Sequence, residues 1–218
     1  MEHVLITGAV RGIGRALAQA YVRDGAQVVA TFRDAAPPDA GIDWQPADVT
    51  DPTSLEALAG HLEGRPLDML ICNAGIYPDK NLDASELTAE LWAQCFAVNV
   101  AGVFWTVQAF RPLLNRGARI AIIGSKMGSS AHANGGAYIY RASKAAVLNL
   151  GRNLATDLRS DGIAVGVYHP GWVRTDMGGP DADIGLDTAV TGLRARFAAL
   201  DLGRSGVFES HDGTALGF

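Results

Sequence analysis

The sequence predicts an α/β fold, in which a doubly wound, mostly parallel β-sheet has helices on both faces and residues 1–218 form one domain. Short, continuously apolar runs alternate with longer amphipathic segments. This pattern is typical of parallel strands that are buried on both faces and joined by helices. The first apolar run ends in a glycine-rich turn that leads into a helix. No repeat or linker divides the 218 residues, so one domain is expected.

The predicted strands are short apolar runs bounded by turn residues, whereas the predicted helices place apolar residues three and four positions apart. Gly25 can end the first helix, and Thr50 or Asp51 can cap the second. The strands are expected at residues 4–7, 27–32, 43–47, 67–72, 119–124 and 163–168, with a last edge strand at 206–209. The helices are expected at residues 14–24, 52–62, 88–114, 138–158 and 188–200.

Composition excludes several classes of protein. The chain has 18 Lys and Arg against 23 Asp and Glu, a net charge of 18 − 23 = −5, which argues against a nucleic-acid surface. No apolar run approaches the ~20 residues that a membrane span needs, and the N-terminus does not resemble a signal peptide. Five histidines show no metal-ligand spacing. Cys72 and Cys95 lie in apolar stretches, so a reducing, cytoplasmic location is expected.

The glycine-rich turn follows the first predicted strand and contains Gly8, Gly12 and Gly14. Glycines at this place let the backbone approach a pyrophosphate, whose charge is met by free N–H groups and the helix dipole. Three residues separate the first two glycines, which departs from the usual Gly-x-Gly-x-x-Gly fingerprint. Dinucleotide binding is the favoured interpretation, and a purely structural turn is the alternative.

The end of the second predicted strand indicates which dinucleotide is bound. NAD enzymes usually place a carboxylate there for the ribose 2′-hydroxyl, but this chain has Phe32 followed by Arg33. Arg33, with Arg11 from the glycine turn, can hold a 2′-phosphate, so NADP is favoured over NAD. Two alternatives stay open: Asp34 can pair with Arg33 or receive the ribose, and both arginines can be solvated surface charges.

Tyr140 and Lys144 are four positions apart and therefore share one face of a predicted helix. A phenol ionises near pH 10, too high for proton transfer at neutral pH. A nearby ammonium group stabilises the phenolate and lowers the pKa of the phenol. Tyr140 is thus a candidate general acid for a developing alkoxide, and a surface pair is the alternative.

Two further polar residues are candidates for the same site. Ser125 follows the fifth predicted strand, at the edge where parallel sheets bind ligands, and its hydroxyl can hydrogen-bond a carbonyl oxygen. Ser129 and Ser130 compete for this role. Asn99 lies inside the long predicted helix, where asparagine is unfavourable; it is either solvated or bends the helix and holds a water.

These motifs resemble the short-chain dehydrogenase/reductase family over nearly the whole chain. Residues 7–14 look like its cofactor turn, Asp48-Val49 like its adenine-contacting pair and Asn73-Ala74-Gly75 like the turn after its fourth strand. Residues 170–175 are similar to its Pro-Gly loop. The resemblance implies a Rossmann fold and a catalytic tetrad formed by Asn99, Ser125, Tyr140 and Lys144. The residues that it implies for cofactor binding, with Arg11 and Arg33 added from the charge argument, are Gly8, Arg11, Gly12, Ile13, Gly14, Arg33, Asp48, Val49, Asn73, Ala74, Gly75, Tyr140, Lys144, Pro170, Gly171, Val173 and Thr175.

The resemblance also implies roles. Tyr140 would exchange the proton, Lys144 would bind the nicotinamide ribose, Ser125 would orient the carbonyl and Asn99 would anchor a water. The 15 positions from Ser125 to Tyr140 exceed the family's usual spacing of about 13, which weakens the serine assignment. The short chain and residues 169–177 are similar to the branch of the C-factor and sniffer carbonyl reductases, which generally uses NADP. A small carbonyl or alcohol substrate and a homodimer or homotetramer are therefore expected.

Two other functions were considered. A cofactor-binding regulator with vestigial chemistry is compatible with the fold, although the intact tetrad argues against it. An extended-type epimerase or dehydratase would need a larger C-terminal substrate domain than the 43 residues after Thr175 (218 − 175). Trp172, Met177, Trp105, Ile76 and Tyr77 are candidates for an apolar lining or for core, and His132 is expected to be a solvated loop residue.

Overall fold

The computed structural model describes residues 1–218 and contains one seven-stranded sheet in which every strand pairs parallel to its neighbours. The strand order is β3-β2-β1-β4-β5-β6-β7, which reverses direction between β1 and β4. The predicted doubly wound fold is therefore confirmed. The strands are β1 (His3–Ile6), β2 (Gln27–Phe32), β3 (Ile42–Pro46), β4 (Leu67–Cys72), β5 (Leu114–Ile123), β6 (Ala164–His169) and β7 (Phe208–Ser210).

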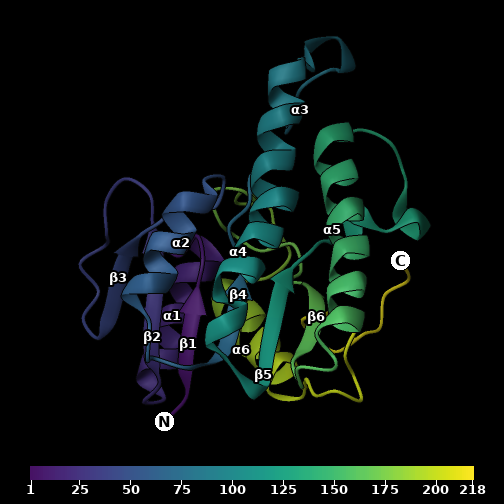
Figure 1. The fold of residues 1–218 in the computed structure, drawn as a ribbon. Coiled ribbons are helices and arrows are strands. Elements are labelled where there is room, and N and C mark those ends of the chain that lie inside the picture. Colours follow the sequence, from purple (N-terminus) through teal and green to yellow (C-terminus); the bar gives the residue numbers. More distant parts are fainter.

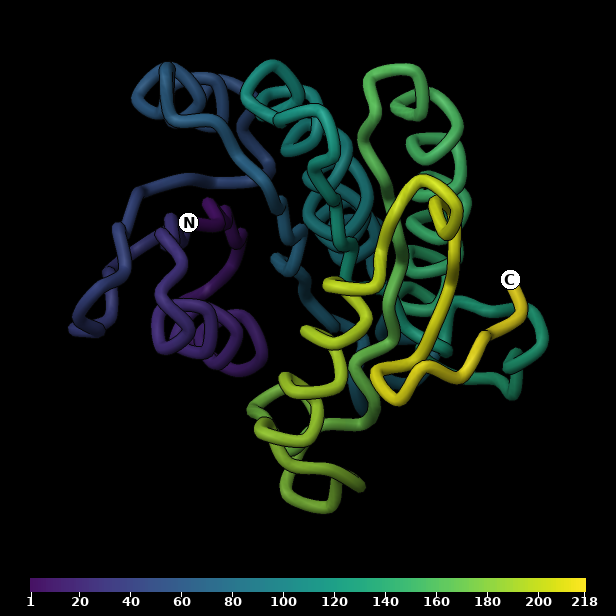
Figure 2. The backbone as a smooth tube through the Cα atoms, turned by 90° about the horizontal axis from the view of Figure 1, so that it is seen from below, coloured from purple at the N-terminus to yellow at the C-terminus, as the bar shows by residue number.

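Helices cover both faces of this sheet, with α2, α4 and α5 on one face and α1 and α6 on the other (Figures 1 and 2). Alternate strand residues pack into the two layers: Leu5 joins the core under α2, α4 and α5, whereas Val4 and Ile6 join the core under α1 and α6. The helices are α1 (Gly12–Arg23), α2 (Pro52–His61), α3 (Ala89–Phe96), α4 (Gly102–Phe110), α5 (Tyr138–Asp157) and α6 (Leu186–Ala198).

The long helix expected at residues 88–114 is not continuous. A π-helical segment, Ala97–Ala101, separates α3 from α4 and contains Asn99. A short 3₁₀ turn, Arg111–Leu113, then ends the helical run. Of the two alternatives for Asn99, a solvated side chain is wrong, because the residue is buried. The helix is irregular at this position, in the form of a π-helical segment.

Several predicted boundaries also differ from the structure. Strand β5 begins at Leu114 rather than at residue 119, because Leu114 pairs with Leu67 ahead of a register shift. Helix α1 begins two residues early, at Gly12, and α6 begins at Leu186. The edge strand β7 lies at residues 208–210 instead of 206–209.

One helical run, Ala89–Leu113, is long and apolar enough to cross a membrane by length and composition alone, although the sequence analysis expected no such run. The core helix of a soluble protein meets the same criterion. Here Val103, Val107 and Phe110 are buried in the core beside the sheet. A single run of this kind is weak evidence for a membrane span.

Close packing of α5 on β6 predicts an asymmetry between two glycine substitutions. A Cβ atom on Gly151 in α5 would lie 2.4 Å from Val167 Cγ2, whereas one on Gly60 in α2 would meet nothing within 4 Å. We expect Gly151→Ala to lower the free energy of unfolding by roughly 1–3 kcal/mol, and Gly60→Ala to raise it by about 0.5–1 kcal/mol. Urea unfolding of both variants measures the difference. Equal effects would contradict the packing described for α5.

Candidate functional site

A cavity of about 490 Å³ opens at the carboxyl ends of the strands, the edge where open α/β sheets bind ligands. It extends from the glycine turn after β1 to the start of α5 and the loop after β6. Most of the residues predicted to bind the cofactor line it. They are Gly8, Arg11, Gly12, Ile13, Arg33, Asp48, Val49, Asn73, Ala74, Gly75, Tyr140, Lys144, Pro170 and Thr175.

The turns after β1 and β4 cross at very short distance. Gly8 has a φ of +65°, and a Cβ atom there would lie 2.6 Å from Ala74 Cα, so only glycine fits. Asn73 Nδ2 donates to the carbonyl oxygens of Thr7 at 3.1 Å and Gly8 at 2.8 Å. Gly14 does not line the cavity; a Cβ atom there would lie 2.4 Å from Asn73 Nδ2. The absence of a side chain at Gly14 is therefore required by packing, whatever its contact with a cofactor.

The amino end of α1 suits an anionic ligand. Arg11 precedes the helix in an extended conformation without capping it through its side chain, and the first turn holds no acidic residue. Gly12 and Ile13, at the start of the helix, line the cavity. Uncapped N–H groups and the positive end of the helix dipole thus lie beside the cavity, where they can receive a pyrophosphate.

The two arginines expected at a 2′-phosphate occupy different surroundings. The Arg33 guanidinium lies at the end of β2, 3.8 Å from the Asp34 carboxylate, and both side chains are largely exposed. Arg11 instead pairs with Asp176 at 2.9 Å, in the loop after β6. Arg11 lines the same cavity as Arg33, and its exposed ion pair with Asp176 places the guanidinium beside the 170–177 loop. The Asp34 alternative matches the observed pair.

Tyr140 and Lys144 lie one turn apart on α5, and both are buried at the cavity wall. Lys144 Nζ donates to the carbonyl oxygen of Ile123 at 2.8 Å and lies 5.7 Å from the centre of the Tyr140 ring. Ser125 is buried without lining the cavity; its hydroxyl accepts from the N–H of Met127 at 3.1 Å and lies near enough to the Tyr140 phenol to act on its pKa. The structure thus brings these three predicted residues together.

Burial dominates the ionisation of this pair. It raises the pKa of Tyr140 well above its ordinary value, and the nearby Ser125 hydroxyl opposes the rise. Burial also lowers the pKa of Lys144 to about 8. The lowered phenol pKa expected from the sequence is therefore not produced by these side chains alone. At neutral pH the phenol is protonated and is poised to donate its proton.

Asn99 is buried, and its amide group is fully used. Its Oδ1 accepts from the N–H of Ile76 at 2.8 Å, while Nδ2 donates to the Ile76 carbonyl at 2.9 Å and to Ser143 Oγ at 3.0 Å. Asn99 does not line the cavity, but Ile76 does. The asparagine therefore holds the backbone that follows the turn at residues 73–75.

Only some of the predicted residues in the loop after β6 line the cavity. Pro170 and Thr175 line the cavity, whereas Gly171 and Val173 do not. A Cβ atom on Gly171, where φ is +88°, would lie 2.6 Å from Ile184 Cδ1, and Val173 is buried in a bridge to Ile184. These two residues anchor the loop rather than face a ligand in the cavity.

The residues considered for the substrate pocket lie in different parts of the structure. Met177 and Ile76 line the cavity. Trp172 and Trp105 are exposed outside it, and His132 is an exposed loop residue, as expected. Tyr77 stacks on Tyr140, with ring centres 4.2 Å apart and planes at 18°.

Two acidic residues at the site were not found from the sequence. Asp176 lines the cavity, and Asp79 binds the start of α5. Asp79 was missed because its partners are more than fifty residues away, so no local pattern marks it. Asp176 directly follows residues 170–175, which resemble the Pro-Gly loop. Its position next to that motif was the signal that could have identified it.

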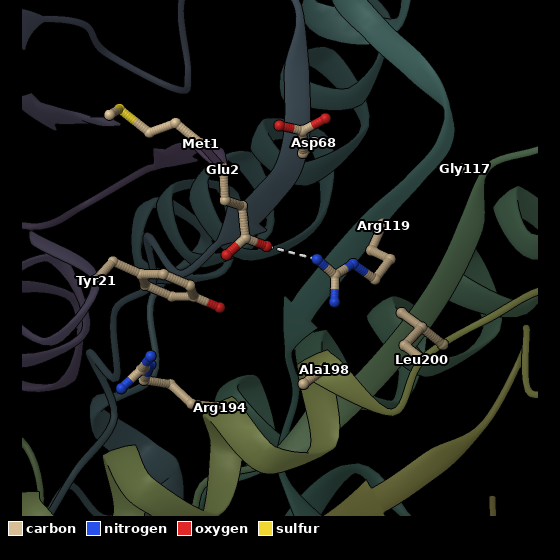
Figure 3. A pocket seen from close by; sticks show the side chains of 9 residues that line it. All are labelled: Met1, Glu2, Tyr21, Asp68, Gly117, Arg119, Arg194, Ala198 and Leu200. Carbon is tan, nitrogen blue, oxygen red and sulfur yellow. Dashed lines mark hydrogen bonds and ion pairs between the residues drawn. The ribbon is translucent and has the colours of Figure 1, made fainter. Parts of the chain in front are cut away.

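A second cavity, of about 620 Å³, lies at the amino ends of β1, β4 and β5 (Figure 3). Its charged groups already form ion pairs. Glu2 pairs with Arg119, and Arg194 pairs with Asp24, which Figure 3 does not draw. The Arg194 guanidinium also lies 4.8 Å from the centre of the Tyr21 ring. Because these charges satisfy one another at the edge away from the strand carboxyl ends, the first cavity is the candidate active site.

Comparison with known proteins agrees with this geometry. A family model described as short chain dehydrogenase matches residues 2–183. This chain belongs to that family of oxidoreductases. It is 37% identical to 1-hydroxy-2-glutathionyl-2-methyl-3-butene dehydrogenase of Rhodococcus sp. (strain AD45), across 99% of both chains. It is also 38% identical to C-signal of Myxococcus xanthus, over 74% of this chain and 99% of that protein.

Solved structures of this family are similar over the full length. NADPH-bound carbonyl reductase from chicken fatty liver has a TM-score of 0.90 and 31% identity, covering 100% of this chain and 99% of that one. The carbonyl reductase Sniffer of D. melanogaster has a TM-score of 0.91 and 27% identity, covering 100% of both. The resemblance to the branch of C-factor and sniffer proteins is thereby confirmed.

The buried amine of Lys144 predicts a pH-dependent stability. Its pKa is about 8 in the folded chain, against 10.5 for a lysine in water, so between these values the unfolded chain binds more protons and stability rises with pH. Relative to Lys144→Met, the wild type should gain about 2 kcal/mol in free energy of unfolding between about pH 7.5 and about pH 9.5. Urea titrations of both proteins at the two pH values test this; a constant difference would show that the amine is not desolvated.

Proposed function

We propose that this protein is an NADP-dependent oxidoreductase that interconverts a small carbonyl compound and its secondary alcohol, with Tyr140 as general acid and base. The observation that carries the proposal is the cluster at the cavity wall. Tyr140 and Lys144 are buried one helical turn apart, and Ser125 is buried near enough to the phenol to act on its pKa. Beside them the uncapped start of α1 can receive the phosphates of a dinucleotide.

The residues around the cavity fit that cofactor, which when bound supplies or accepts the hydride at its nicotinamide. Gly8, Gly12 and Ile13 would lie against the pyrophosphate, since their backbone lines the cavity and a side chain at Gly8 would collide with Ala74. Asp48 and Val49 would flank the adenine, and Asn73, Ala74 and Gly75 would support the ring system of the nucleotide. Pro170 and Thr175 would hold the carboxamide, on a loop anchored by Gly171 and Val173.

The side chains at the cavity wall would then move the proton. In the reductive direction the phenol of Tyr140 donates to the oxygen of the substrate as negative charge develops there. Its raised pKa keeps this proton in place at neutral pH. Ser125 would orient the same oxygen, and Lys144 would bind the ribose and stabilise the phenolate. Asn99, whose amide group already binds Ile76 and Ser143, would support the site through the backbone that it holds rather than through a water on its side chain.

Arg33 supports NADP over NAD. It lines the cavity at the end of β2, where a carboxylate for the ribose hydroxyls would otherwise lie. Its charge also helps to hold the pKa of Asp48 below the ordinary value, although the backbone N–H of Thr50 has the larger effect. The carbonyl reductase from chicken fatty liver was solved with NADPH bound, which agrees with this choice.

The substrate class follows from the relatives and from the cavity. The Rhodococcus relative is named for the dehydrogenation of a hydroxy compound, and the two structural relatives are named carbonyl reductases. Ile76 and Met177 give the cavity an apolar part, which suits an apolar carbonyl compound. We also propose a cytoplasmic homo-oligomer, a dimer or tetramer assembled through the helices that carry Asn99 and Tyr140.

Replacement of Tyr140 tests the assigned chemistry. We expect Tyr140→Phe to lower kcat by about a thousandfold, because the variant loses the proton donor, while the Kd for NADPH changes less than about twofold. Tyr138→Phe, an exposed tyrosine at the start of the same helix, is the matched control and should keep full activity. The assay follows NADPH oxidation with a panel of aldehydes and ketones.

A fully active Tyr140→Phe variant would overturn the assignment of the acid. A wild type that binds NADPH but turns over no carbonyl or alcohol would instead support a cofactor-binding regulator.

Side-by-side titration of NADPH and NADH tests the role of Arg33. The wild type should prefer NADPH by about tenfold or more, equivalent to about 1.4 kcal/mol, because the guanidinium meets the 2′-phosphate. Arg33→Ala should remove most of this preference by weakening NADPH binding alone. Arg23→Ala, an exposed arginine in the last turn of α1, is the control. Equal binding of the two cofactors by the wild type would assign the ribose to Asp34.

A further inference from the structure

Asp79 is the one buried aspartate of the chain, with 2% of its surface exposed. It lies in the segment after β4, four residues beyond Gly75. A buried carboxylate is costly unless its oxygens accept hydrogen bonds. Its partners are backbone groups: Oδ2 accepts from the N–H of Ile139 at 2.8 Å, and Oδ1 accepts from the N–H of Tyr140 at 3.1 Å.

The start of α5 depends on this distant carboxylate. Ala137 precedes the helix in the left-handed conformation, with φ +47° and ψ +43°, and offers no side-chain cap. The first turn holds no acidic residue either. Asp79 therefore supplies, from about sixty residues away, the acceptor that a serine or aspartate at the N-cap normally provides. One of its two bonds is to the backbone of Tyr140 itself.

The residues beside Asp79 contact the same site. Two residues earlier, Tyr77 stacks on the Tyr140 ring, and the backbone of Ile76 is held by Asn99. One residue later, Lys80 Nζ donates to the carbonyl oxygen of Met177 at 2.7 Å. Residues 76–80 thus connect the ring and backbone of Tyr140 to the π-helical segment and to the loop after β6.

We propose that Asp79 is a positioning residue that caps the start of α5 and thereby holds Tyr140 in place beside Tyr77. The same carboxylate places a negative charge near the phenol. The part of this inference that concerns turnover rests on the proposed function. The carboxylate end of Asp79 is bonded to the first turn of the helix, so its loss would let the segment that carries the phenol move relative to Ser125. Displacements of about 1 Å at a reacting group can lower a rate a hundredfold.

Several groups face the phenol and must be separated from Asp79. Tyr77 and Asp79 come from the segment after β4, Cys95 comes from α3, Lys144 from α5 and Ser125 from the end of β5. Burial is the largest cause of the raised pKa of Tyr140, and the negative charge of Asp79 acts in the same direction. A neutral residue at position 79 should therefore lower the pKa of the phenol.

Two substitutions separate capping from charge. Asp79→Ala removes both and should lower kcat about tenfold or more while the KM for NADPH stays within about twofold. Asp79→Asn keeps one acceptor oxygen, which can still receive both N–H groups because Oδ2 already lies 2.8 Å from the nitrogen of Ile139 and 3.4 Å from that of Tyr140. It should recover part of the rate at the pH optimum. The effect of the lost charge on the phenol is measured without turnover, because Lys144 is neutralised near pH 8 and would dominate an alkaline decline in rate. If the alanine variant does not fold, the asparagine variant carries the test.

The control is Asp51, an exposed aspartate that caps α2 through the N–H of Thr53 at 2.9 Å. Asp51→Ala removes a capping bond from another helix, and Asp51→Asn keeps the acceptor oxygen there while removing the charge. They should alter stability without changing kcat or its pH dependence. If the Asp51 variants lost as much kcat as the Asp79 variants, the effect of Asp79 would be that of any helix cap and not a specific effect on Tyr140.

A spectroscopic titration gives a readout that needs no turnover. In ligand-free protein labelled with 3-fluorotyrosine, the ¹⁹F signal of residue 140 is assigned by its absence in Tyr140→Phe. That signal should titrate at lower pH in Asp79→Asn than in the wild type, and at unchanged pH in Asp51→Asn. An unmoved titration, or a folded Asp79→Ala variant with wild-type kcat, overturns the inference. If the wild type reduces none of the carbonyls tested, the proposed function fails, and the ¹⁹F titration alone decides the role of Asp79.

Discussion

A wholly parallel sheet must be buried on both faces, because the crossover connections between its strands place helices over each of them. This constraint accounts for the continuously apolar strands and for the two cores on either side of the sheet. It also directs every strand of the sheet towards one edge. The turns after β1, β2, β4, β5 and β6 therefore meet there, although they lie far apart in the sequence.

The polar groups at that edge are satisfied mainly by the backbone. Asn73 binds the carbonyls of the glycine turn, Asn99 binds both polar groups of Ile76, and Lys144 binds the carbonyl of Ile123. Each of these hydrogen bonds joins one side chain to the backbone. It therefore fixes a loop or a side chain without ordering a second side chain. A site held in this way is formed before a ligand arrives, and preformed geometry is what general acid catalysis requires.

Burial moves the two central ionisable groups of the site in opposite directions. The phenol of Tyr140 is harder to ionise and the amine of Lys144 is easier to neutralise, because each charged form loses hydration. Buried groups of this kind respond strongly to any charge placed nearby, since the surroundings screen it weakly. The carboxylate of Asp79 is such a charge, and the phosphates proposed to bind at α1 would add others.

Local sequence patterns were sufficient for the order of strands and helices, the place of the glycine turn and the pairing of Tyr140 with Lys144. The reason is that apolar periodicity and the four-residue helical spacing act over one or two turns of chain. The tertiary structure decided the π-helical segment around Asn99, the early start of β5, the pairing of Arg11 with Asp176 and the capping of α5 by Asp79. Each depends on a partner that only folding brings within hydrogen-bond or packing distance, so no single stretch of sequence contains it.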